Sequence, residues 1–259
     1  MIKRHRVLLV MLLGAFGWSL FSVNWAGPIV HTGGGSSFLK LWLSLFPPDL
    51  SLEFLWIASR ATWKTFTFAV MGIALAVSLG LPMGVIASGI LSERSSINRL
   101  STIIVFRGLL GGMRAVHELV WAVVLVVAIG LSPVAGIIAL GIPYGGILGR
   151  IYADLLQGAP NAPIDALRQT GASPLKILFY GYIPSVLPDM LSYTFYRFEC
   201  SIRAAAILSF IGIQGLGYQI QLSLLDLLFD QVWTLLLFLI GLIVLVDLWS
   251  TRVRRSLLV

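Results

Sequence analysis

Three ionisable residues lie close together in a long apolar stretch of the chain, residues 185–213. Arg197, Glu199 and Arg203 would be costly to place in a membrane, where such side chains usually serve a function. Glu199 and Arg203 are four residues apart and can pair on one face of a helix, which would only neutralise charge and order the helix. Alternatively, Arg197 or Arg203 could offer guanidinium hydrogen bonds to an oxyanion.

No residue pattern typical of a catalytic or metal site is evident. His5, His31 and His117 are scattered without the spacing of metal ligands, so we expect no catalytic residue and no metal. An enzyme within the membrane, with Glu199, Arg197 and His117 as acid–base groups, is a competing interpretation, but nothing positions a nucleophile beside a base. The sequence also lacks a G-x-x-x-x-G-K-[ST] phosphate loop, so ATP hydrolysis would have to come from a partner.

A polar segment of about 30 residues, at about 154–184, interrupts the apolar pattern. Ala162-Pro163-Ile164-Asp165 predicts the start of a helix with a proline and an acid in its first turn. Gly171 is expected to end this helix, because glycine tolerates a left-handed cap. Ser173-Pro174 predicts a second helix that runs to Pro184. Such a segment suits docking into a cleft of another protein, and a plain polar connector is the alternative.

Composition indicates the class of protein that must position these groups. Hydrophobic residues make up 58% of the 259 residues, charged residues only 11%, and the mean hydropathy is +0.94. A soluble domain carries roughly a quarter charged residues, so this composition excludes a water-soluble globule. The length allows about six membrane spans of ~20 residues. The net charge of +7 does not indicate nucleic-acid binding, because it follows the membrane topology instead of forming one basic face.

Hydropathy predicts six spans, at 7–25, 66–90, 118–130, 134–153, 185–213 and 232–250. The third is short, and residues 103–112 are expected to extend it as a surface or re-entrant helix. Residues 27–48 are expected to form an extracytoplasmic loop, and residues 51–64 an amphipathic helix that leads into the second span. The basic start at Lys3-Arg4-His5-Arg6 is also compatible with a cleaved signal peptide, although the apolar run is long and lacks a clear A-x-A site.

The distribution of basic residues predicts the orientation. With the N- and C-termini in the cytoplasm, only three cations fall outside, namely Lys40, Arg60 and Lys64. Thirteen of the 18 Lys and Arg residues then fall inside, namely Lys3, Arg4, Arg6, Arg94, Arg99, Arg107, Arg114, Arg150, Arg168, Lys176, Arg252, Arg254 and Arg255.

Small residues recur at fourfold spacing in two of the expected spans. Gly80 and Gly84 lie in the second span, and Gly141, Gly145 and Gly149 lie in the fourth. Glycine lets helix backbones approach closely in lipid, where the hydrophobic effect does not drive association. These faces therefore predict either packing within one chain or a seam between two copies.

Several runs resemble one transporter family. They comprise Ala166–Ser173 with Pro184, then residues 191–199, Ile202-Arg203-Ala204-Ala205, Glu118-Leu119-Val120-Trp121-Ala122 and residues 245–250. Together, over about residues 100–255, they resemble the binding-protein-dependent inner membrane permeases of ABC importers, in particular phosphonate and phosphite permeases. Asp165 replaces the usual glutamate of the family's EAA loop, Leu167 its second alanine, and His117 a proline common before Glu118.

The resemblance implies an all-α, polytopic membrane protein with about six transmembrane helices and the type I ABC importer permease fold. Residues 1–63 would form an N-terminal helix and loop, and residues 64–255 the importer domain. The EAA loop would dock the ATPase through Asp165, Ala166, Leu167, Gly171, Ala172 and Pro184. Gly212, Gly215 and Gly217 match a glycine-rich turn of the family, which would be part of an outer gate or only a tight turn.

The resemblance also implies the partners. Two copies of the chain would form the channel in the bacterial inner membrane, surrounded by lipid, with two ATPase subunits that bind ATP and Mg²⁺. This chain would bind no cofactor and no nucleic acid. An extracytoplasmic binding protein would deliver a phosphonate or phosphite, with Arg197, Glu199 and Arg203 near the pathway. A permease for an amino acid, a metal or another oxyanion is the alternative.

Overall fold

The computed structural model describes residues 2–23, 34–91 and 97–257, which form helices and turns without a strand. Arg94 and residues 27–33 of the expected loop lie outside the described residues. The helices in chain order are α1 (Ile2–Ser22), α2 (Gly34–Leu43), α3 (Leu52–Ser88), α4 (Ile97–Ala115), α5 (Glu118–Ile129), α6 (Pro133–Gln157), α7 (Asn161–Gln169), α8 (Pro174–Ile177), a π-helical turn (Leu178–Tyr182), α9 (Ile183–Leu208), a 3₁₀ turn (Ser209–Ile211), α10 (Leu216–Leu225) and α11 (Phe229–Leu257). The all-α class is confirmed.

The chain divides into two compact units, Met1–Phe46 and Pro47–Val259. The first contains α1 and α2, so part of the segment expected as a loop is helical. Phe38 and Trp42, one helical turn apart, make an edge-to-face ring contact with centroids 6.2 Å apart. Apolar residues at helical spacing after the glycines explain why a helix forms here.

Helix α3 is one continuous helix of 37 residues that combines the expected amphipathic segment with the second span. Ser51 caps its start by accepting a hydrogen bond from Phe54 N at 3.4 Å, and Glu53 lies in the first turn. Gly89 ends it with φ of 68°. The sequence-based boundary between residues 63 and 64 therefore falls inside this helix.

The glycines of α3 pack against those of α6. A Cβ on Gly80 would lie 2.9 Å from Gly145 O and 3.0 Å from Gly149 N, and one on Gly84 would lie 2.7 Å from Gly149 O. The two helices are therefore in direct backbone contact at these glycines. The interpretation of these glycines as packing surfaces within one chain is confirmed, because only a hydrogen side chain allows this approach.

Three described helices, α3, α6 and α11, are long and apolar enough to cross a membrane individually. Two bent pairs bring the total to five: α4 with α5, at 85°, and the helix ending at Ile211 with α10, at 44°. Residues Arg6–Ser22 of α1 form a shorter apolar helix. The expected extension of the third span by the preceding helix thus takes the form of a sharply broken pair.

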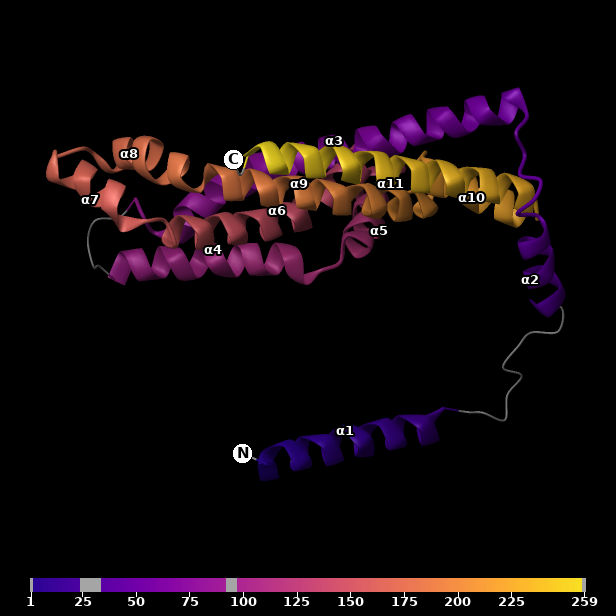
Figure 1. The fold of residues 1–259 in the computed structure, drawn as a ribbon, viewed down its shortest axis with the longest axis horizontal. Helices are drawn as coiled ribbons and strands as arrows, with labels where there is room; N and C mark the ends of the chain where they lie inside the picture. Colours follow the sequence, from indigo (N-terminus) through magenta and orange to yellow (C-terminus); the bar gives the residue numbers. More distant parts are fainter. Residues whose placement is uncertain (1, 24–33, 92–96, 258–259) are drawn as a thin grey trace. The chain divides into compact units, whose positions relative to one another are not determined.

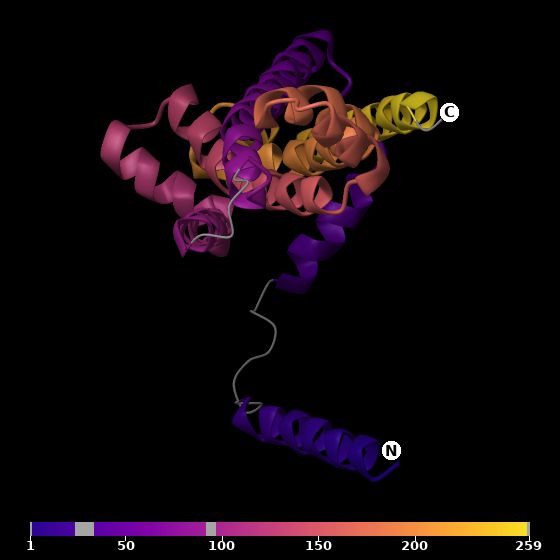
Figure 2. The ribbon, with the colours of Figure 1, turned by 90° about the vertical axis from the view of Figure 1, so that its left-hand side faces the viewer.

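The second unit has two distinct ends. Helices α7 and α8 lie at one end, and α10 lies toward the other, beside the first half of α11 (Figure 1). Figure 2 faces the end that carries α7 and α8. Between the ends, α6 contacts α9 through a hydrogen bond between Tyr152 Oη and Thr194 Oγ1, 2.6 Å long. The residues expected to dock a partner and those of the glycine turn are therefore far apart.

Candidate functional site

Helix α7 begins at Asn161, after Pro160, and has no acidic residue in its first turn. The prediction of an acid in that turn is therefore wrong. Asp165 lies in the second turn, where its Oδ1 accepts a hydrogen bond from Arg168 Nη1 at 3.2 Å. The helix starts before the predicted residues because Pro163 fits within a first turn, where its missing N–H is not needed.

Gly171 makes the turn between α7 and α8 and has a left-handed backbone, with φ of 73°, as predicted. Its N–H donates to Arg168 O at 3.0 Å, and the N–H of Ala172 donates to Leu167 O at 3.3 Å. This is the hydrogen-bond pattern of a Schellman-type helix end. A Cβ at Gly171 would meet nothing within 4 Å, so conformation and not crowding is the reason for glycine.

The loop is held on the π-helical turn by its apolar residues. Ile164 is only 1% exposed. The Leu167 Cδ1 atom lies 3.0 Å from where a Cβ of Gly181 would be, and Arg168 Nη2 donates to Tyr182 Oη at 3.4 Å. The outward-facing residues are Asp165, Ala166, Gly171 and Pro184, with Leu167 and Ala172 half-buried. The loop is thus a fixed polar surface that another protein can contact.

The second helix of this segment begins at Ser173-Pro174, as predicted, but it does not end at Pro184. After α8 the chain continues through the π-helical turn directly into α9. Pro184 lies in the first turn of α9. The widened turn before it accommodates a residue that has no N–H, so the proline does not stop the helix.

The cluster in α9 is arranged differently from the predicted pair. Glu199 Oε1 accepts a hydrogen bond from Arg254 Nη2 of α11 at 2.8 Å, so the predicted pairing with Arg203 is wrong. Four-residue spacing permits that pair, but Glu199 projects toward α11, whereas Arg203 is exposed. Arg203 Nη2 instead contacts the Sγ atom of Cys200 at 3.6 Å.

Arg197 is half-buried, and its Nε atom is buried without a hydrogen-bond partner among the described residues. Its guanidinium carbon lies 5.4 Å from the centre of the Tyr196 ring, a weak cation–π contact. Tyr144 of α6 is buried, and Glu118, Arg197 and Arg203 all act electrostatically on its phenol. Polar groups from α5, α6 and α9 therefore share one region of the membrane-spanning part.

The face of α9 that carries Arg203 is not covered within the second unit. Its exposed members recur at helical spacing and are Tyr193, Tyr196, Arg203 and Ile207. An arginine among aromatic and aliphatic side chains on an uncovered helix face is costly against lipid alone. This stripe can line an aqueous pathway or an interface.

The glycine turn after α9 depends on both conformation and close packing. Gly212 has φ of 101° and ends the 3₁₀ turn. A Cβ on Gly215 would collide with Ser209 Oγ, and one on Gly217 would collide with Ala206 O. The N–H of Leu216 donates to Thr65 Oγ1 of α3 at 2.9 Å and so attaches α10 to α3.

Sequence reasoning missed two groups that matter here, Arg254 and Thr65. Hydropathy placed Arg254 outside the last span, and Thr65 lacks any local signal because it lies in an apolar helix. Their partners are 55 and 151 residues away in sequence. The only sequence signal for a partner of Glu199 was that Arg254, a positively charged residue, lies close to the end of the last predicted span.

Comparison with known proteins gives a family match over most of the chain. The model of the family "Binding-protein-dependent transport system inner membrane component" matches residues 80–259. The chain is similar to the phosphite transport system permease protein PtxC of Stutzerimonas stutzeri, with 30% identity over 81% of this chain and 74% of the relative. It is 30% identical to the putative phosphite permease HtxC of the same organism, over 99% of this chain and 88% of the relative.

A solved structure has a similar fold. A chain of the MetNI methionine ABC transporter, in an inward-facing conformation, matches with a TM-score of 0.70 and 21% identity, over 80% of this chain and 99% of that chain. At this identity the likeness concerns the fold, which is the type I importer permease fold expected from the sequence.

Proposed function

This chain belongs to the family of binding-protein-dependent transport system inner membrane components, and from this premise we propose that it forms the translocation pathway for a phosphonate or a related phosphorus oxyanion, such as phosphite. It is a multi-pass membrane subunit of an importer and not itself an ATPase. ATP and Mg²⁺ bind to the partner ATPase, and this chain holds no cofactor.

The proposal of an anionic cargo rests on the positive charge of α9. Glu199 is neutralised by Arg254, so Arg197 and Arg203 have no carboxylate partner among the described residues. Guanidinium groups without an ion-pair partner in a largely apolar segment favour an anionic cargo, and a planar guanidinium matches the oxygens of a phosphorus oxyanion. The printed names of the relatives PtxC and HtxC support the same cargo class.

The segment of α7 and α8 is the proposed contact with the ATPase. Asp165, Ala166 and the Gly171 turn face outward, while Ile164 anchors the segment underneath. A rigid surface can transmit the movement of a nucleotide-driven partner to α9, which continues directly from the π-helical turn. The orientation follows from the basic residues, with this end and both termini in the cytoplasm.

Two copies of the chain form the pathway in this proposal. A single bundle supplies half of a two-fold channel, and the uncovered α9 stripe needs a partner or water in place of lipid. The remaining exposed apolar side chains contact membrane lipid. Gly212, Gly215 and Gly217 place α10 beside the far end of α3, where an outer gate would be formed.

Reconstitution tests the function. The chain is assembled in vesicles with the ATPase and binding protein of its source, and ATP-dependent uptake of labelled phosphite, a labelled phosphonate and methionine is compared. We expect ATP-dependent uptake of phosphite or the phosphonate and no uptake of methionine. Uptake of methionine alone would show that the cargo is a different small solute and would refute the proposed oxyanion.

A further inference from the structure

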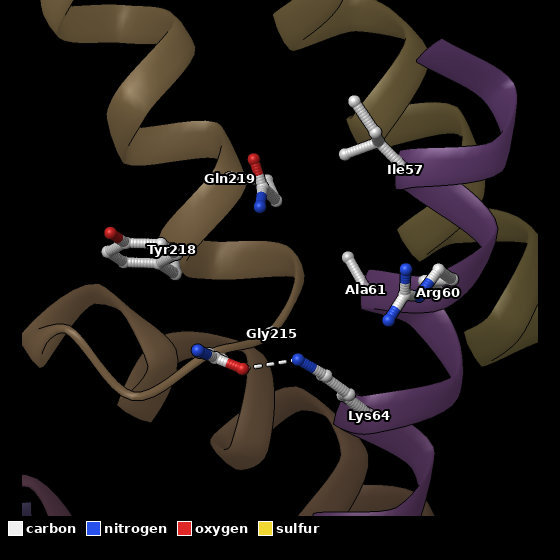
Figure 3. Close-up of a pocket in the computed structure, with 8 residues that line it drawn as sticks. Ile57, Arg60, Ala61, Lys64, Gly215, Tyr218 and Gln219 are labelled. Carbon is white, nitrogen blue, oxygen red and sulfur yellow. Dashed lines mark hydrogen bonds between the residues drawn. The ribbon is translucent and has the colours of Figure 1, made fainter. Parts of the chain in front are cut away.

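A pocket opens between α3 and α10, near the end of the bundle remote from α7 and α8 (Figure 3). Its volume is about 250 Å³. Arg60 and Lys64 line it from α3, and Gln214, Gly215, Tyr218 and Gln219 line it from the segment of α10. Pockets for drug-sized molecules take about 300–1,000 Å³, so this one is suited to a small ligand.

The two cations project from one face of α3. Arg60 and Lys64 are four residues apart, and Figure 3 shows both extending toward α10. No carboxylate lines the pocket, and neither cation forms an ion pair with a described residue. Two like charges four residues apart destabilise a helix, so Arg60 and Lys64 do not contribute to the stability of α3 through each other. A bound anion would compensate the repulsion.

The uncharged groups of the pocket also suit an anion. Lys64 Nζ donates to Gln214 Oε1, which leaves the amide NH₂ of Gln214 as a further donor. The N-terminus of α10, at Gly215, adds the positive end of a ten-residue helix. The bond from Leu216 N to Thr65 Oγ1 joins the two walls next to Lys64. Lys64 and Gln214 are therefore held in place before a ligand arrives.

The position of the pocket gives it a role. Lys40, Arg60 and Lys64 are the few basic residues expected outside the membrane, against the general excess of positive charge inside. Gly215 of the proposed outer gate lines the pocket, and neither Arg197 nor Arg203 of α9 does.

We propose that this outer anion pocket binds the phosphorus oxyanion between its release by the binding protein and its entry into the pathway; the inference rests on the proposed function. Arg60 and Lys64 supply charge-assisted hydrogen bonds to the oxyanion, and Gln214 and Gln219 supply neutral ones. A weak site of this kind raises the local anion concentration without trapping the cargo.

The experiment uses the permease–ATPase complex in detergent, without the binding protein. Binding of labelled phosphite is measured by equilibrium dialysis, and uptake is measured separately in vesicles with the binding protein. Loss of two charged donors in Arg60→Gln/Lys64→Gln should weaken phosphite binding at least about tenfold and slow uptake. Arg60 is exposed, so Arg60→Gln alone gives a variant that folds and shows part of the loss. Arg60→Lys/Lys64→Arg should keep most of the binding.

Two controls separate the pocket from other positive charges. Lys40→Gln removes one expected outer charge that does not line the pocket and should leave binding unchanged. Arg252→Gln removes an exposed cation near the end of α11 that does not line the pocket, and it should also leave dialysis binding unchanged. Normal phosphite binding and uptake in Arg60→Gln/Lys64→Gln would overturn the inference while the proposed function stands.

The other outcomes are equally decisive. Normal dialysis binding together with loss of ATPase stimulation by the binding protein would mean that the cations hold acidic side chains of that protein, and the inference would be wrong. Phosphite uptake by the wild type without any phosphite binding in dialysis would also overturn it. If the wild type fails to take up phosphorus compounds, the proposed cargo is refuted. If the wild type then binds sulfate, and Arg60→Gln weakens that binding, the pocket is still an anion site.

Discussion

The carboxylate of Glu199 in α9 accepts a hydrogen bond from the guanidinium of Arg254 in α11, with 2.8 Å between Oε1 and Nη2. The Glu199 side chain is 14% exposed and that of Arg254 27% exposed, so water screens the pair only in part. The bond joins α9 to the C-terminal part of α11. Arg197 and Arg203 thus have no ion-pair partner among the described residues.

Arg254→Gln should therefore lower the stability of the protein, because it leaves Glu199 charged and largely buried without its partner. We expect a loss of about 1–3 kcal/mol, measured as a lower midpoint of thermal unfolding in detergent. Arg255→Gln, at an exposed neighbouring position, is the matched control. The double variant Glu199→Gln/Arg254→Gln should recover part of the loss. Equal midpoints for Arg254→Gln and Arg255→Gln would contradict a stabilising ion pair.

Arg203→Gln should reduce uptake while leaving the unfolding midpoint nearly unchanged. Arg203 is exposed and does not neutralise Glu199, so its removal leaves no buried charge unpaired. Arg197→Gln should reduce uptake as well and should be tolerated, since no described residue depends on its Nε atom. Uptake of labelled phosphite and thermal unfolding are measured on the same preparations. Normal transport by both variants would remove α9 from the substrate pathway.

Gly171→Ala should uncouple ATP hydrolysis from uptake or weaken co-purification of the ATPase. A residue with a Cβ pays about 1–2 kcal/mol in the left-handed conformation, so the turn between α7 and α8 will shift. Gly158→Ala is the control, because Gly158 caps α6 with φ of −85° and a Cβ there makes only ordinary contacts. If Gly171→Ala assembles and transports like Gly158→Ala, the coupling role of this turn is incorrect.

Two copies of the chain should be cross-linked through the α9 stripe. In a Cys200→Ser background, which has no other cysteine, Ile207→Cys introduces a thiol at a position that is 53% exposed. A bis-maleimide reagent should then produce a covalent dimer in membranes. Leu245→Cys on α11, 68% exposed, is expected to face lipid and to remain monomeric. A covalent product of this chain with a different permease would show that the pathway is not a homodimer.

Asp49 should make the region before α3 sensitive to acid. The backbone N–H of Ser51 donates to its Oδ1 at 2.9 Å, and this bond, followed by one from the Ser51 side chain, lowers the pKa of Asp49 below its usual 3.8. A lowered carboxyl pKa contributes stability above pH 3.8, and the contribution is lost as the pH falls through the folded-state value. Asp49→Asn should thus unfold at a lower temperature than the wild type at pH 6, and the difference should shrink below pH 3.8. A difference that persists unchanged in acid would exclude this carboxylate as its source.

Local rules explain which features were predictable. The left-handed Gly171 and the helix start at Ser173-Pro174 follow from the conformational limits of single residues, and neighbouring residues suffice to indicate them. The apolar runs were sufficient for the all-α class and the approximate spans, because lipid solubility is a property of each segment by itself. The family resemblance added the expected fold, which the comparisons confirm.

The partners of charged residues could be decided only by the tertiary structure. The four-residue spacing allowed Glu199 to pair with Arg203, but the packing of α9 against α11 places Arg254 within hydrogen-bond distance of Glu199 instead. The cations Arg60 and Lys64 form a pocket only because Thr65 binds the start of α10, which follows more than 140 residues later. Hydropathy measures how well a segment tolerates lipid, not which neighbour its side chains meet. That choice depends on how whole helices pack, and no local stretch of sequence encodes it alone.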